Sequence, residues 1–117
     1  MYFIFFADDV PASHSSKKFP PVIREDPADA SVLKQSPATL KCKADGNPKP
    51  DILWFKDGRP FPGPERPEVL ILEDGSSLFF LDVGNDDVGV YWCVARNSEG
   101  ASKSQNATLV IAREFPL

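Results

Sequence analysis

The chain has 117 residues, a formal net charge of −4 and a pI of about 4.9. A chain of this length can enclose one ordinary two-layer core. Its acidic balance gives no electrostatic footprint for nucleic acid, and it contains no apolar run long enough to span a membrane as a helix. Twelve prolines argue against an all-α fold. We therefore expect a single β-rich domain.

The first residues are apolar over Met1–Phe6 and then acidic and small. This stretch is too short for the apolar region of a signal peptide, so the sequence does not by itself prove secretion. We expect a poorly ordered lead-in over residues 1–19, a folded domain over 20–113 and the start of a linker over 114–117.

Apolar and polar residues then alternate in short segments that are separated by turn residues, as in a β-sandwich. A first edge strand over Phe19–Glu25 is kinked by Asp26-Pro27 and resumes over Ala30–Lys34. Between the later strands we expect a stiff proline-rich loop over Arg59–Pro67 and a corner over Gly84–Asp87. The later strands are predicted at Ala38–Ala44, Ile52–Lys56, Val69–Leu72, Ser77–Val83, Gly89–Asn97 and Ser102–Ile111.

Five residues fix the fold class. Cys42 and Cys93 frame Trp54, and Tyr91 lies two residues before the second cysteine. Asp87 precedes this tyrosine at the corner. In an immunoglobulin-like sandwich the cysteines bridge the two sheets, the tryptophan packs on the sulfurs and the tyrosine forms a corner hydrogen bond. We therefore predict an all-β, immunoglobulin-like sandwich of the I-set kind, since the connection after the Trp54 strand is too short for a variable domain.

The cysteine pair bears on the compartment. A disulfide that closes a loop of about 52 residues would stabilise the fold by roughly 4 kcal/mol and would indicate an oxidising compartment. The alternative is a pair of reduced, buried thiols, as in intracellular modules of the same fold. Asn106-Ala107-Thr108 is a glycosylation sequon, and it favours the oxidising compartment.

No catalytic or metal-binding group stands out. The only histidine, His14, lies in the expected lead-in, and the cysteines have no histidine or further cysteine partners for a zinc site. The acidic corner Asp82–Asp87 suggests calcium only weakly, because Asp87 has a structural role to fill. We expect neither an enzyme nor a cofactor, and no metal.

In the segment Ser77–Val83, both sets of alternating residues contain large apolar side chains. Strand alternation makes Leu78, Phe80 and Val83 the natural core set, with a slip at the corner, and leaves Phe79 and Leu81 facing outward. Two outward apolar side chains on one sheet are typical of a protein-binding patch.

Charged residues surround this predicted patch. Lys41 and Lys43 are the outward residues of the neighbouring strand, and Glu25 lies on the strand beyond it. The alternative is that Phe79 packs on the lysine stems or beneath the proline-rich loop. A second candidate surface is Trp92, which alternation places outward on the other sheet. There it is either exposed, or covered by Phe55 or by the long side chains of Arg96 and Lys103.

At these residues the sequence resembles the first immunoglobulin domain of the roundabout axon-guidance receptors, over about residues 19–115. The cysteine, tryptophan and tyrosine framework is common to I-set domains, whereas the outward Leu-Phe-Phe-Leu run and the residues that flank Cys93 are more selective. The segments that carry the resemblance are Pro20–Asp29, Pro37–Gly46, Ser77–Leu81, Val90–Asn97 and Asn106–Leu109.

The resemblance implies an extracellular receptor domain, with further immunoglobulin domains in the intact chain. In that family the first domain binds the leucine-rich repeats of the secreted ligand Slit. The positions that match the family's contacts are Glu25, Lys41, Lys43, Phe79 and Leu81, although Lys41 stands where the family commonly has Asn. The family's basic segments for heparan sulfate are replaced here by the acidic corner and a proline-rich loop, which argues against that partner.

Two alternatives remain open at this point. One is a homophilic or heterophilic neural adhesion module that uses the Trp92 surface. The other is a structural I-set module of an intracellular muscle protein, which would have reduced cysteines and an unmodified Asn106.

Overall fold

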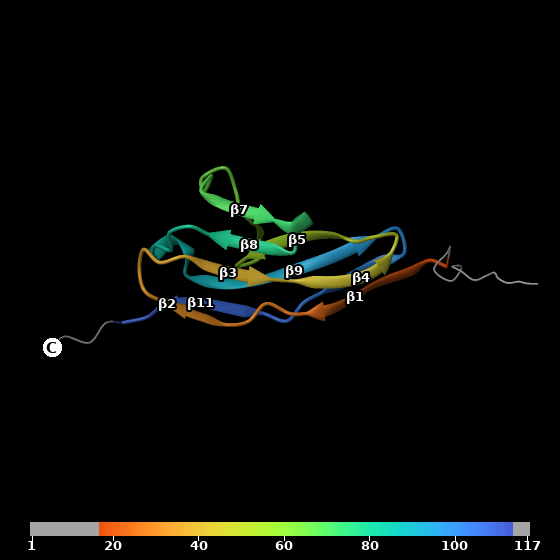
Figure 1. The fold of residues 1–117 in the computed structure, drawn as a ribbon, viewed down its shortest axis with the longest axis horizontal. Coiled ribbons are helices and arrows are strands. Elements are labelled where there is room, and N and C mark those ends of the chain that lie inside the picture. Colours follow the sequence, from red (N-terminus) through yellow and green to blue (C-terminus); the bar gives the residue numbers. More distant parts are fainter. Residues whose placement is uncertain (1–16, 114–117) are drawn as a thin grey trace, which may run out of the picture.

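The computed structural model describes residues 17–113, and they form a two-layer β-sandwich (Figure 1). The predicted lead-in over residues 1–16, with His14, and the predicted linker over 114–117 lie outside the described residues. The strands are β1 (Phe19–Glu25), β2 (Ala30–Val32), β3 (Ala38–Lys41), β4 (Lys43–Asn47), β5 (Asp51–Lys56), β6 (Arg59–Pro60), β7 (Val69–Leu72), β8 (Ser77–Phe80), β9 (Gly89–Asn97), β10 (Gly100–Lys103) and β11 (Ala107–Ile111), with single 3₁₀ turns η2 (Glu73–Gly75) and η3 (Asn85–Asp87).

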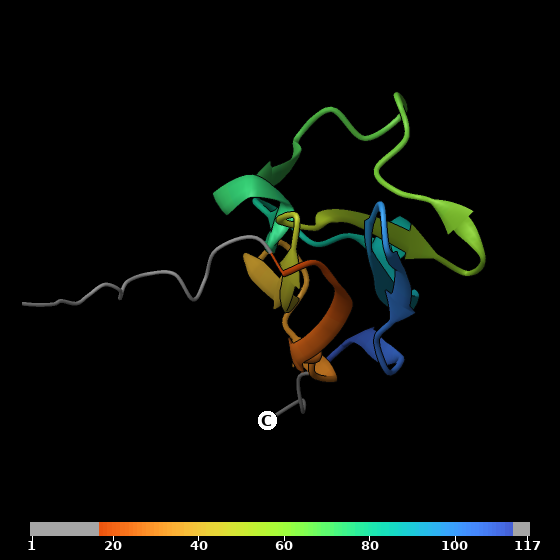
Figure 2. The ribbon, with the colours of Figure 1, turned by 90° about the vertical axis from the view of Figure 1, so that its right-hand side faces the viewer.

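One layer is the sheet β2-β11-β9-β5-β6, with β10 paired to β9. The other layer contains the sheet β3-β8-β7 and the two-stranded ladder β1-β4, and only Cys42 separates β3 from β4. Figure 2 shows the loop between β6 and β7 arching from one layer to the other at the top of the view. The all-β, immunoglobulin-like prediction is confirmed.

The first edge strand changes layers, a feature that the alternation pattern did not reveal. β1 pairs antiparallel with β4, whereas β2 pairs parallel with β11 in the opposite sheet. Asp26 Oδ1 accepts a hydrogen bond from Gln105 N at 2.9 Å, and Asp29 Oδ1 accepts one from Thr108 N at 2.8 Å. These two carboxylates therefore hold the crossing segment against the last strand.

Four predicted strands are interrupted or shortened, and the first of them, Ala30–Lys34, ends at Val32 as β2. The predicted strand Ala38–Ala44 is divided into β3 and β4 at Cys42, whose N–H bonds to Ser76 O. The predicted strand Ser77–Val83 ends at Phe80, and the bend that follows returns Val83 to the core with no exposed surface. The predicted last strand is divided into β10 and β11 because the buried Ser104 hydroxyl accepts the Cys93 N–H at 2.9 Å.

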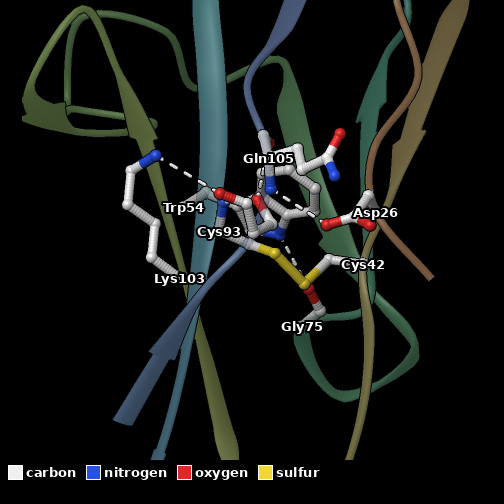
Figure 3. Close-up of a disulfide and its surroundings, with 8 residues drawn as sticks. Asp26, Cys42, Trp54, Gly75, Cys93, Lys103 and Gln105 are labelled. Atoms are coloured by element: carbon white, nitrogen blue, oxygen red, sulfur yellow. Dashed lines mark hydrogen bonds between the residues drawn. A yellow bond between two sulfur atoms is a disulfide. The ribbon is translucent and has the colours of Figure 1, made fainter. Parts of the chain in front are cut away.

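The core is the framework that the sequence predicts. Cys42 and Cys93 form a disulfide between the layers, with Cα atoms 6.5 Å apart (Figure 3). Trp54 lies beside the sulfurs and donates from Nε1 to Gly75 O at 2.7 Å. The Tyr91 hydroxyl donates to Asp87 O at 2.5 Å, which closes the tyrosine corner. Burial raises the pKa of the Tyr91 phenol, and the Asp87 carboxylate raises it further.

The corner between β8 and β9 is fixed by a buried charge. The Asp87 side chain has no exposed surface, and it accepts from Gly84 N at 2.8 Å and contacts Arg66 Nη1 at 2.6 Å. Arg66 comes from the proline-rich loop, so this ion pair ties the loop to the corner. Phe61 of the same loop packs edge-on against Tyr91, with ring centroids 5.3 Å apart. The proline-rich loop therefore covers the core on its inner side.

Candidate protein-binding surface

The outward side of the sheet β3-β8-β7, which we call the aliphatic face, presents apolar side chains to solvent. Phe79 lies at its centre on β8, between Thr39 of β3 and Leu70 of β7 in the register. Phe79 is half-buried, whereas Leu70 and Leu72 remain 46% and 44% exposed. Leu81, directly after β8, is 61% exposed. The prediction that Phe79 and Leu81 point away from the core is confirmed.

Lys41 lies at one end of the aliphatic face. It pairs with Ser77 in the register, which places it diagonally across from Phe79 on the neighbouring strand. Ser77 Oγ donates to Glu73 Oε1 at 2.7 Å, and this hydrogen bond, with the attraction of Lys41, lowers the pKa of Glu73. A carboxylate that stays ionised therefore accompanies the lysine beside the apolar centre.

The other two charged residues of the predicted surface lie on the separate ladder β1-β4. Glu25 and Lys43 are cross-strand partners, and Lys43 Nζ is 3.9 Å from Glu25 Oε1. Both side chains are about half exposed, so the pair contributes little to stability. Lys43 and Glu73 line the same shallow pocket, so Lys43 lies near the Lys41 end of the aliphatic face, and its charge also lowers the pKa of Glu73. The structure thus brings Lys41 and Phe79 onto one side of the sheet, leaves Leu81 exposed directly after β8, and sets the Glu25–Lys43 pair on the adjoining ladder.

Sequence reasoning missed Leu70 and Leu72. The signal was present, because Val69–Leu72 is a four-residue apolar run that was assigned to a strand. A strand can bury only alternate residues on one side, so two of these four had to face outward. Val69 is buried against the core, which fixes the parity and places Leu70 and Leu72 outward.

The outward side of β5, β9 and β10, which we call the aromatic face, carries the second candidate residue, Trp92. Its ring stacks on Phe55, with centroids 6.0 Å apart and planes 13° apart. Lys103 Nζ lies 4.7 Å from the centre of the Trp92 ring. Of the three covering residues considered from the sequence, Phe55 and Lys103 contact Trp92, and the indole stays partly exposed.

The described residues contain neither a cluster of metal-binding side chains nor a helix that could span a membrane. Residues 17–113 contain no group of three histidine, cysteine, aspartate or glutamate side chains that could hold an ion. Within the same range, no helix is long and apolar enough to span a bilayer. At the acidic corner the Asp87 carboxylate is occupied by Arg66, whereas Asp82 and Asp86 face solvent.

Sequence comparison relates the chain to receptor proteins. Residues 21–111 match the family described as Immunoglobulin I-set domain. Human Roundabout homolog 1 is 45% identical over 102 residues, which is 80% of this chain and 6% of that protein. The chain therefore spans a small fraction of the length of these relatives.

Structural comparison finds the same fold in a titin–obscurin like 1 complex and in a receptor protein tyrosine phosphatase. A chain from the crystal structure of a titin immunoglobulin domain in complex with obscurin like 1 has a TM-score of 0.73 and 27% identity, with 86% of this chain and all of that chain covered. The N-terminal Ig1-2 module of the Drosophila receptor protein tyrosine phosphatase DLAR has a TM-score of 0.73 and 31% identity, with 96% and 53% covered. The chain belongs to the immunoglobulin I-set family and is related to the immunoglobulin domains of the roundabout homologues.

Proposed function

We propose that the chain is an extracellular ligand-binding domain of a roundabout-like cell-surface receptor, and that its aliphatic face binds the leucine-rich repeats of a Slit-like ligand. The observation that supports this proposal is the exposed apolar residues on the outward side of β7 and β8: Leu70 pairs with Phe79, Leu72 lies two residues further along β7, and Leu81 is exposed directly after β8. Scattered exposed apolar residues are ordinary, but a contiguous apolar patch bordered by charges is typical of an interaction site. The sequence relationship to the roundabout homologues supports the choice of ligand class.

In this proposal the apolar side chains anchor the ligand and the charges orient it. Burial of Phe79, Leu81 and their neighbours on β7 would contribute roughly 1.5–3 kcal/mol for each side chain that becomes fully buried. Lys41 and the Glu25–Lys43 pair at the rim would guide association, since rim charges affect the rate of encounter more than the affinity. The Phe79 position has the central, half-enclosed setting that is typical of a binding hot spot.

The test is the dissociation constant for the leucine-rich-repeat domain of Slit, measured with the wild type, Leu81→Asp and Phe79→Asp. Leu81→Asp adds a charge at an already exposed position, so we expect it to fold normally and to weaken binding about 30-fold or more. Val110→Asp is the matched control, because Val110 is 38% exposed on the opposite layer. Unchanged binding by a folded Leu81→Asp variant would refute the site.

A second candidate function is adhesion through the aromatic face, which the partly exposed Phe55–Trp92 stack supports. It predicts self-association or binding to another adhesion molecule that is lost in Trp92→Ala. Sedimentation of the wild type at high concentration, beside Trp92→Ala, tests the homophilic form. A strictly monomeric wild type would count against it.

A third candidate is a structural module of an intracellular filament protein, which the likeness to a chain of the titin–obscurin like 1 complex supports. It requires reduced Cys42 and Cys93 and an unmodified Asn106 in the native protein. An intact mass from native tissue decides between this candidate and an extracellular one, because a disulfide lowers the mass by two hydrogen atoms and a glycan raises it.

A further inference from the structure

The glycosylation sequon lies at the break between β10 and β11. Asn106 is exposed in this break, and Thr108 of the same sequon is exposed on β11. Lys103 Nζ contacts Asn106 Oδ1 at 3.0 Å, and within residues 17–113 the structure records no partner for Asn106 Nδ2. The amide nitrogen that would carry a sugar therefore faces solvent, while the amide oxygen is held by a lysine of the neighbouring strand.

The same lysine connects the sequon to the aromatic face. Its ammonium group is 3.0 Å from Asn106 Oδ1 and 4.7 Å from the centre of the Trp92 ring. One amino group thus bridges the two side chains, and Trp92 lies within the reach of a single sugar ring attached at Asn106. Phe55 supports the Trp92 ring from one side, since the two rings are stacked with nearly parallel planes.

This surface has the chemistry that binds a pyranose. The C–H groups on one side of a sugar ring pack on an aromatic ring, because both surfaces are apolar and the ring face is electron-rich. Hydroxyl and acetamide oxygens on the sugar edge accept hydrogen bonds from an ammonium group, which has three donors and no acceptor. Trp92 offers the ring, and Lys103, whose ammonium group lies over that ring and contacts Asn106 Oδ1 and Ser104 O, offers a donor beside it.

We propose that Asn106 carries an N-linked glycan whose first N-acetylglucosamine packs on Trp92 and Lys103 and covers the aromatic face. In the modification, Asn106 Nδ2 bonds to the anomeric carbon of a lipid diphosphate-linked oligosaccharide, the lipid diphosphate leaves, and the amide nitrogen loses one proton. The inference rests on the proposed function, because the modification requires passage through the secretory pathway. Its consequence is that the aliphatic face stays open for a protein ligand while the aromatic face is shielded.

The test uses the full 117-residue chain behind a secretion signal, expressed in mammalian cells and trimmed with an endoglycosidase to a single N-acetylglucosamine. Thr108→Ala removes the sequon but keeps the backbone N–H that bonds to Asp29, and Thr108→Ser is the control that keeps the sequon. Intact mass reports the modification. A secreted, folded wild type without a glycan would overturn the proposal.

Iodide quenching of tryptophan fluorescence reports the packing. Trp54 is 2% exposed, so the quenchable signal belongs to Trp92, and Trp92→Val checks this assignment. We expect the quenching constant of the trimmed wild type and of Thr108→Ser to be at most half that of Thr108→Ala. Equal quenching constants in the modified and unmodified forms would overturn the proposal.

Thermal unfolding supplies a second readout on the same proteins. Packing of the sugar on Trp92 is expected to raise the midpoint of the wild type by about 3–5 °C over Thr108→Ala. The rise is expected to disappear in the Trp92→Val background, where the ring is missing. A rise of equal size in both backgrounds would contradict packing on Trp92.

These outcomes are separate from the outcome of the ligand test. The mass, quenching and unfolding measurements use no protein ligand, so they can succeed if Slit-like repeats do not bind. The ligand test uses variants of the aliphatic face only, so it can succeed if the glycan does not pack on Trp92. Reduced Cys42 and Cys93 together with an unmodified Asn106 in protein from native tissue would instead refute the extracellular assignment on which both rest.

Discussion

The aliphatic and aromatic faces both carry apolar side chains, but the surroundings of these side chains differ. On the aliphatic face, Leu70, Leu72 and Leu81 are each more than two-fifths exposed. On the aromatic face, Trp92 is half-buried by its contacts with Phe55 and Lys103. One face is therefore open to a partner, whereas the other is already covered in part by the domain's own side chains.

The difference teaches that alternation alone does not identify a binding face. Strand periodicity places Phe79 outward on one sheet and Trp92 outward on the other by the same rule. The neighbouring side chains decide whether an outward residue is open to a partner or covered. Phe79 is surrounded by flexible aliphatic side chains at the surface, while Trp92 has a stacked ring on one side and a cation over it.

The largest expected effect comes from the crosslink that holds the two faces back to back. The double variant Cys42→Ala and Cys93→Ala is expected to lose about 4 kcal/mol of the free energy of unfolding, because the disulfide no longer restricts the unfolded chain. Urea unfolding of the variant beside the oxidised wild type measures the loss. An unchanged free energy of unfolding would show that the disulfide does not stabilise the packing of the two layers that carry the faces.

The next effect separates the two sides of one strand. Leu70 and Ile71 are adjacent on β7 and are 46% and 48% exposed, but Leu70 lies beside Phe79 and Ile71 pairs with the buried Leu78. We expect Leu70→Ser to weaken binding of the leucine-rich repeats about 10-fold, through loss of buried apolar area. Ile71→Ser, as the matched control, is expected to change the dissociation constant less than two-fold. Equal losses in both variants would indicate that β7 acts through stability and not through contact.

A smaller loss of stability is expected from a change in the core. It tests whether ligand binding at the surface depends on the tyrosine-corner hydrogen bond. Tyr91→Phe removes the hydrogen bond to Asp87 O and is expected to lower the free energy of unfolding by about 1 kcal/mol. Because Tyr91 is buried between the layers, ligand binding by the folded variant is expected to match the wild type. Chemical unfolding and binding measured on one preparation test both statements. A weakened affinity at full folding would show that the corner shapes the aliphatic face.

The smallest effect is the titration of Glu73 beside the aliphatic face. The Ser77 hydroxyl and Lys41 lower the pKa of Glu73 below its usual value of 4.5, so the ionised form is favoured in the folded state. Its contribution to stability is present above pH 4.5 and is lost as the pH falls through the lowered pKa. NMR titration is expected to show a higher Glu73 pKa in Ser77→Ala and in Lys41→Met. Lys103→Met, on the aromatic face, is the control and is expected to leave the Glu73 pKa unchanged.

Much of the fold was predictable because it depends on local patterns. The cysteine, tryptophan and tyrosine framework is recognisable from the order and spacing of these residues in the sequence. Each of the side chains occupies its expected place in the core. The layer change between β1 and β2 was not predictable from alternation, since either sheet accepts an edge strand of that pattern. The hydrogen bonds from Gln105 N to Asp26 and from Thr108 N to Asp29 fix the choice, and they join residues far apart in the sequence.

The candidate surface was predictable in part for the same reason. Phe79 and Leu81 follow from the parity of one strand and its slip at the corner, which are both visible in the sequence. The bridge from Asn106 through Lys103 to Trp92 was not visible, although each of the three residues was singled out separately. It depends on how β10 breaks before β11, and the buried Ser104 hydroxyl causes that break.

The sequence by itself determined the fold class, the cysteine, tryptophan and tyrosine framework of the core and the parity of each long strand, because these follow from residue type and a period of two. The tertiary structure alone decided which outward residues remain open and which are covered. It brought Leu70 beside Phe79 and Lys103 over Trp92 by placing separate strands in register. Exposure is a property of neighbours, and neighbours in a sandwich come from distant parts of the chain.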